Sequence, residues 1–190
     1  MQETLKALDN SNRTDILYSL IKPHIKDGMS FLDIGCGFSH LPKMQGTCLS
    51  LRIHADFPET HYLGIDRRED VIEQCKNEQP FYSWACGEVT SFNFAGGFDF
   101  IIHLGFDRAR YSDAWRIHLK FLEELRGPQV VLLEAGCRPL ETHSEHLETY
   151  YTVSSFYHSA GYEILEEGDY TWTAPVTQPQ RFYRIFGRNG

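Results

Sequence analysis

The chain has 190 residues, 42% of them hydrophobic, and its 26 acidic and 18 basic residues give a formal net charge of −8. This length fits one domain over residues 1–190 with a sizeable core, and the acidic balance disfavours a partner bound mainly through phosphates, such as nucleic acid or an anionic membrane. Five cysteines without a Cys-x-x-Cys spacing, no signal-peptide pattern and no apolar run near the about 20 residues of a membrane helix indicate a cytoplasmic protein without a membrane span.

Hydrophobic periodicity predicts an alternation of helices and strands along the chain. In chain order, the patterns predict helix 12–26, strand 30–34, helix 41–57, strand 61–66, helix 68–76, strands 81–85 and 98–104, helix 111–125, strand 130–134, helix 144–160, and strands 162–165 and 181–186. The last two strands have only a Pro-containing loop between them, which predicts an antiparallel hairpin. The whole string predicts an open, doubly wound α/β sheet of seven strands, mostly parallel, with a C-terminal antiparallel hairpin.

Four features lie at the ends of the first four predicted strands and would meet at the carboxyl edge of the sheet, where such folds bind ligands. They are Asp33 with the turn Gly35-Cys36-Gly37, then Asp66, then Gly87-Glu88, and finally His103. Glycine lets a ligand approach the backbone closely, a carboxylate can accept two hydrogen bonds from a ribose diol, and a second acceptor can meet the amine of a base. Together these features predict a site for an adenosine-type ligand.

A dinucleotide site is the first alternative, because Gly35-x-Gly37 begins the pattern G-x-G-x-x-G. The third glycine position holds His40. Asp33 stands two residues before the first glycine, where its charge would repel a pyrophosphate but suit a ligand with an ammonium group. The residues therefore favour a ligand other than a dinucleotide.

At this point the sequence resembles the class I S-adenosylmethionine-dependent methyltransferases, which have a Rossmann-like fold. The segments that carry the resemblance are residues 31–37 (FLDIGCG), 62–66 (YLGID), 85–89 (ACGEV), 98–102 (FDFII) and 130–134 (VVLLE). The sequence departs from the family pattern at Glu88, where Asp is more usual, and at Ser39, where glycine is common.

The resemblance implies S-adenosylmethionine as cofactor and assigns its contacts residue by residue. It implies that the turn Gly35-Cys36-Gly37 passes along the methionine part and that Asp33 helps to hold its ammonium group. It also implies that Asp66 binds the ribose hydroxyls and Glu88 the adenine amine. Arg67, Gly87 and His103 complete the expected cofactor site, and the helix over residues 12–26 is expected to cover it.

Each of these residues also has a purely structural interpretation. Asp66 would cap the following helix equally well, Glu88 alone is typical of a solvated loop, and Cys36 fits a small filler between glycines. Asp33 favours function, because a carboxylate in an apolar strand end is costly unless it is paired.

His103 is the best-placed candidate for a general base, because a histidine titrates near neutrality and this one ends a strand at the crevice. A base is needed only if the acceptor loses a proton before or during methyl transfer. The alternative for His103 is a residue that lines the methionine pocket or hydrogen-bonds to backbone, and His40 is a second, weaker base candidate.

A cluster of two histidines and two carboxylates follows the fifth strand: Glu141, His143, Glu145 and His146. Metal binding is one interpretation, but acidic residues in a first helical turn are expected from the helix dipole alone, so no metal site is predicted. Residues 139–169 hold seven carboxylates and no Lys or Arg. The resemblance implies methyl transfer, and this acidic region favours O, N or C of a small molecule as the acceptor. RNA or protein methylation and a non-catalytic S-adenosyl ligand-binding protein are the alternatives, and the oligomeric state stays open.

Overall fold

The computed structural model describes residues 13–37, 49–92, 94, 97–104, 118, 129–135, 144–171 and 180–188. The helices are α2 (Arg13–Ile21), α3 (Leu49–Asp56), α4 (Glu69–Glu78) and α6 (Ser144–Ser159), with short 3-10 helices η1 (Lys22–His24) and η4 (Val89–Ser91). The strands are β1 (Ser30–Ile34), β2 (His61–Asp66), β3 (Ser83–Cys86), β4 (Phe100–Leu104), β5 (Val130–Ala135), β6 (Tyr162–Thr171) and β7 (Gln180–Arg188). Among these residues, no helix has the length and apolar character needed to cross a membrane.

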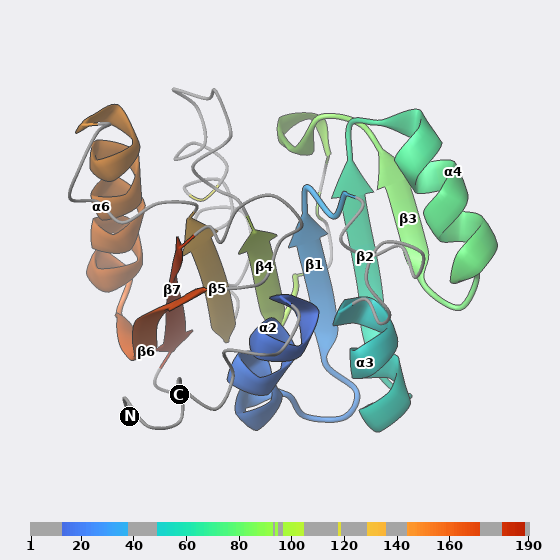
Figure 1. The fold of residues 1–190 in the computed structure, drawn as a ribbon, viewed down its shortest axis with the longest axis horizontal. Helices are drawn as coiled ribbons and strands as arrows, with labels where there is room; N and C mark the ends of the chain where they lie inside the picture. The colour runs from blue at the N-terminus through green and yellow to red at the C-terminus, as the bar shows by residue number, and fades with distance from the viewer. Residues whose placement is uncertain are drawn as a thin grey trace.

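The seven strands form one sheet in the order β3-β2-β1-β4-β5-β7-β6 (Figure 1). The pairs from β3 to β5 are parallel, whereas β7 pairs antiparallel with both β5 and β6. This confirms the predicted doubly wound sheet with its C-terminal hairpin. The chain order reverses between β1 and β4, and ligands of such sheets bind near that reversal, beyond the carboxyl ends of the strands.

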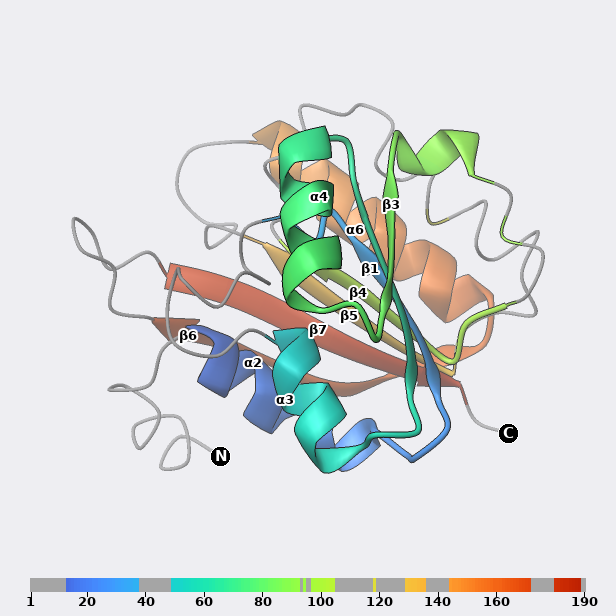
Figure 2. The same cartoon turned by 90° about the vertical axis from the view of Figure 1, so that its right-hand side faces the viewer.

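Side chains alternate between the two faces of the sheet and build a core on each. One core joins β1 and β4 to the helices α2, α3 and α4 through Phe31, Phe100, Ile16, Ile53 and Val71. The other joins the same strands to α6 through Leu32, Ile101, Val153 and Tyr157. The sheet therefore lies between α2, α3 and α4 on one side and α6 on the other (Figure 2).

The structure contains the predicted elements that it describes, but some bounds differ. The α-helix predicted over residues 12–26 ends at Ile21, and Lys22–His24, which includes Pro23, forms the 3-10 helix η1. The strand predicted over residues 98–104 begins at Phe100. The strands predicted at 30–34 and 61–66 are confirmed at the same bounds, and the strand predicted at 81–85 lies at Ser83–Cys86. Both hairpin strands are longer than predicted, because edge strand β6 carries exposed carboxylates that interrupt its apolar pattern. Residues 41–48 of the second predicted helix, and the helix predicted at 111–125 apart from His118, lie outside the described residues.

Helix α2 packs beside α3 in front of the sheet (Figure 1). The hydroxyl of Tyr18 donates to Asp56 at 2.5 Å, and the Lys22 ammonium contacts the same carboxylate at 2.6 Å. Arg52 pairs with Asp15 across the same two helices. These contacts tie the N-terminal helix to the element that follows the glycine turn, and its predicted role of covering the cofactor stays a prediction.

Candidate functional site

The glycine turn leaves β1 and is held on the end of β2 by two backbone bonds. The N–H groups of Gly35 and Cys36 donate to the carbonyl of Ile65 at 2.8 and 3.0 Å. Gly35 and Gly37 have φ angles of +66° and +48°, in the left-handed region that favours glycine. The turn therefore depends on glycine at both positions, and it leaves its backbone beside the neighbouring strand.

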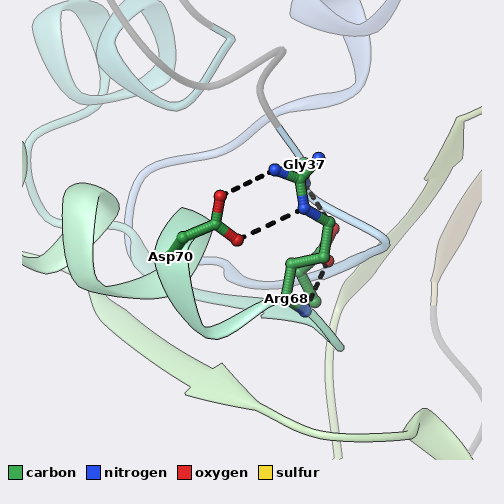
Figure 3. A network of polar contacts seen from close by, with 4 residues as sticks. Gly37, Arg68 and Asp70 are labelled. Atoms are coloured by element: carbon green, nitrogen blue, oxygen red, sulfur yellow. Dashed lines mark hydrogen bonds and ion pairs between the residues drawn. The ribbon is translucent and has the colours of Figure 1, made fainter.

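Asp66, the last residue of β2, bridges the glycine turn and the start of α4. Its Oδ2 accepts from the backbone N–H of Gly37 at 2.9 Å, and its Oδ1 accepts from the N–H of Arg68 at 3.0 Å. The Arg68 side chain forms a two-bond ion pair with Asp70, shown in Figure 3. Because each carboxylate oxygen has further lone-pair capacity, Asp66 can hold the turn and accept ligand hydroxyls at the same time.

Asp33 is a buried carboxylate, 1% exposed, on the face of β1 that carries α2 and α3. The Tyr62 hydroxyl donates to its Oδ2 at 2.6 Å. In the sheet register Asp33 lies opposite Gly64, and Gly64 opposite Trp84. A Cβ on Gly64 would stand 2.3 Å from the Trp84 ring. The missing side chain thus makes the space that the indole fills next to Asp33.

Cys36 has a fully buried side chain between the two glycines. Its contact with Cys75 and its burial raise the pKa of the Cys36 thiol far above the usual range, so the thiol stays protonated. A protonated, buried thiol is a poor nucleophile. The structure agrees with a small filler at this position, whose backbone shapes the turn.

The segment after β3 joins the same edge of the sheet. The N–H of Gly87 donates to the carbonyl of Asp66 at 3.0 Å, and the thiol of Cys86 contacts the carbonyl of Arg67 at 3.5 Å. Gly87 has a φ of +151°, and Glu88, which follows it, is exposed. The structure therefore brings the glycine turn, Asp66 and Gly87 together by direct bonds, with Arg67 and Glu88 exposed beside them.

His103 lies on β4 opposite Ile34 of β1, one residue before the strand ends. It is only 7% exposed, and its Nδ1 lies 3.0 Å from Nε2 of His118. His118 in turn contacts the Tyr157 hydroxyl through Nδ1 at 2.7 Å. Burial lowers the pKa of His103 to about 4, against a smaller opposing effect of Asp33. His103 is therefore neutral at physiological pH.

Sequence reasoning did not single out His118 or its contact with Tyr157. The three side chains are 15 and 39 positions apart along the chain, and no local spacing joins them. A histidine among apolar residues, as in Ile117-His118-Leu119, was the one available signal.

The structure does not describe the cluster for which metal binding was one interpretation. The part of the chain that it describes leaves out Glu141, His143 and the side chains of Glu145 and His146. Within the part of the chain that the structure describes, no group of three or more metal-ligating side chains comes together.

Comparisons with known proteins find structures with a similar fold but no protein with a matching sequence. No protein-family model and no curated protein matches the chain. Among solved structures, the N-methyltransferase NodS from Bradyrhizobium japonicum is 12% identical, with 94% of this chain and 95% of that chain covered and a TM-score of 0.68. A TehB-like SAM-dependent methyltransferase from Corynebacterium glutamicum is 18% identical, with 99% and 94% covered and a TM-score of 0.57.

The same fold also occurs in the [4+2]-cyclase SpnF, which is 15% identical, with 95% of this chain and 86% of that chain covered and a TM-score of 0.66. At these identities the likeness concerns architecture, and function has to come from the site. The chain therefore has the fold of class I S-adenosylmethionine-dependent methyltransferases.

Proposed function

We propose that the chain is an S-adenosylmethionine-dependent methyltransferase that acts on a small molecule. The observation that carries the proposal is the bond from Gly37 N–H to Asp66, which joins the glycine turn to the carboxylate at the end of β2. This arrangement stands at the reversal of strand order, where a doubly wound sheet binds its ligand. The fold of the methyltransferase structures supports the same assignment.

The residues present fit this cofactor. Apart from the residues next to Gly35 in the chain, no atom of the described residues lies within 4 Å of the position that a Cβ on Gly35 would take. The turn therefore has room for a ligand against its backbone. The carboxylates at this edge match the ligand's polar groups, with Asp66 for the ribose diol, Glu88 for the adenine amine and Asp33 for the ammonium group. Gly87 and Arg67 complete the wall beside Asp66.

The bound cofactor would supply a methyl group on a positively charged sulfur, ready for in-line displacement. The chain's own contribution is then to hold the acceptor in line with that methyl group, since orientation alone can supply much of the acceleration. Three hydrogen bonds serve this purpose by fixing one side of the site: from Gly35 to the Ile65 carbonyl, from Gly37 to the Asp66 carboxylate, and from Gly87 to the Asp66 carbonyl.

A small acceptor is favoured over RNA because of the charge distribution. Residues 139–169, which follow β5 and lead into the hairpin, carry seven carboxylates and no Lys or Arg. A polyanion would meet repulsion there without basic residues to release its counterions. Methylation of RNA or of a protein side chain, and ligand binding without catalysis, are the competing outcomes of the test below.

Calorimetry with S-adenosylhomocysteine, S-adenosylmethionine and NAD tests the cofactor first. We expect both S-adenosyl ligands to bind and NAD not to bind. If neither S-adenosyl ligand gives a heat of binding, the proposal is overturned. Transfer of tritium from labelled cofactor into size-separated cell extracts then tests the reaction. Label in the small-molecule fraction supports the proposal. Label in RNA or protein instead identifies that macromolecule as the acceptor, and no label in any fraction favours a protein that binds the ligand without catalysis.

A further inference from the structure

Three polar side chains form a continuous chain inside the otherwise apolar layer between the sheet and α6. His103 on β4 contacts His118 at 3.0 Å, and His118 contacts Tyr157 on α6 at 2.7 Å. His118 and Tyr157 are both 0% exposed. Around them Tyr157 stacks on Phe186 and meets the ring of Tyr162 edge to face. A polar chain at such depth is costly unless every proton finds an acceptor.

The direction of the bonds follows from Tyr157. Among the described residues, the Tyr157 hydroxyl has His118 as its hydrogen-bond partner and no other. Burial, with a smaller effect of Tyr162, raises the pKa of Tyr157 well above its usual value, so the phenol keeps its proton. A buried hydroxyl proton without an acceptor costs the full desolvation of that group. Tyr157 therefore donates its O–H to Nδ1 of His118.

The positions of the protons on the two histidines then follow. His118 is neutral, because burial and the neighbouring His103 lower its pKa well below the usual value. With Nδ1 accepting from Tyr157, its one proton is on Nε2, which donates to Nδ1 of His103. His103 is neutral as well, so its own proton is on Nε2.

We propose that Tyr157 and His118 are positioning residues that hold His103 as the Nε2–H tautomer, so that His103 offers the site a hydrogen-bond donor and not a proton acceptor. The group that such a donor recognises is an oxygen with a lone pair, and the carboxylate of the cofactor's amino acid part is the one we assign to it. This use of the donor rests on the proposed methyltransferase function, whereas the tautomer itself does not. The assignment replaces the general base predicted from the sequence.

Long-range ¹H–¹⁵N NMR of labelled protein reads the tautomer directly. At pH 7 we expect His103 and His118 both as neutral Nε2–H rings, assigned with the variants His103→Gln and His118→Gln. Tyr157→Phe keeps the ring packing and removes only the hydroxyl, so His118 should pass to a mixture of tautomers. Tyr162→Phe, a buried tyrosine of the same cluster, is the matched control and should leave both rings unchanged. A proton on Nδ1 of His103, a charged His103 at pH 7, or no change in Tyr157→Phe overturns the proposal.

Calorimetry with S-adenosylhomocysteine tests the donor's target. His103→Gln, which retains an N–H donor, should bind within about threefold of the wild type, and His103→Leu should bind about 10- to 150-fold more weakly, as expected for one lost hydrogen bond to a charged group. Equal affinity of the two variants overturns donation to the cofactor. If the wild type binds no S-adenosylhomocysteine while the tautomers are as expected, the proposed function fails, but the roles of Tyr157 and His118 in positioning His103 are kept.

Discussion

The carboxylate of Asp66 accepts a hydrogen bond from the backbone N–H of Gly37 at 2.9 Å. The bond spans 29 positions of sequence and joins the turn after β1 to the end of β2. A Cβ on Gly37 would stand 3.6 Å from the same carboxylate. The conformation of the turn and the position of the carboxylate are therefore coupled, and a change at either residue is felt at the other.

Replacing Asp66 with alanine should weaken binding of S-adenosylhomocysteine by about 1 to 3 kcal/mol, or about 5- to 150-fold, through lost charge-assisted hydrogen bonds and a loosened turn. Asp66→Asn keeps one acceptor oxygen without the charge and should fall between alanine and the wild type. Calorimetry measures both, with circular dichroism to verify folding. Asp70→Ala, which removes only the exposed partner of Arg68, is the control and should bind within about twofold of the wild type. Wild-type affinity in a folded Asp66→Ala would remove this residue from the site.

Tyr62→Phe removes the hydroxyl that donates to buried Asp33 at 2.6 Å. The ring stays, so the aromatic stacking is kept, and a carboxylate loses a bond in an apolar surrounding. We expect the free energy of unfolding to fall by about 1.5 to 3 kcal/mol, measured by urea denaturation. Tyr82→Phe is the comparison, since Tyr82 stacks on Tyr62 and its hydroxyl contacts the neutral Thr60 hydroxyl at 3.1 Å. Its loss should be smaller, about 0.5 to 1.5 kcal/mol; equal losses would contradict a special role for the bond to Asp33.

Gly64→Ala should destabilise the fold because the new Cβ would stand 2.3 Å from the Trp84 ring. Overpacking of this kind costs about 1 to 3 kcal/mol, which urea denaturation measures. In a Trp84→Leu background the same substitution should cost less, since the ring that it meets is gone. A double-mutant cycle with no coupling between the two positions would show that the contact does not limit stability.

The free energy of unfolding should fall as the pH is lowered through the range where histidines titrate. Burial lowers the folded-state pKa of His103 to about 4 and that of His118 well below 6.5, so the unfolded chain binds protons that the folded chain does not. The stabilisation is thus complete above pH 7, begins to fall near pH 6.5, and for His103 continues to fall until the pH reaches its folded-state pKa of about 4. Between pH 7.5 and 5.5 we expect a loss of about 1 kcal/mol for each of the two histidines.

Urea denaturation at the two pH values measures this loss. His118→Gln should show a smaller difference between them, because one of the two buried neutral rings is gone. His158→Gln, at an exposed position of α6, should show the wild-type difference. A stability that is equal at both pH values, or higher at pH 5.5, would contradict the neutral burial of this pair.

Much of the architecture was predictable because it is written in short-range patterns. The strands Ser30–Ile34 and His61–Asp66 are apolar runs that end in a glycine turn and a carboxylate, and both appear at the predicted bounds. The lengths of β6 and β7 were not predictable from apolar runs, since these strands satisfy part of their charge across the hairpin, as in the bond from Arg184 to Glu167 at 2.8 Å. Hydrophobic periodicity reports burial and is weakest where a strand lies at an edge.

The sequence by itself determined the class of fold and the turn that begins the site. Glycine at positions 35 and 37 meets a local backbone requirement, and Asp66 is the last residue of its strand, so short segments of the sequence were enough to identify both features. Only the tertiary structure decided what the buried polar groups do. Tyr62 reaches Asp33, and Tyr157 reaches His103 through His118, because the sheet and its helices bring them within hydrogen-bond distance. The direction of a hydrogen bond and the proton on a histidine depend on that environment, which no spacing in the sequence encodes.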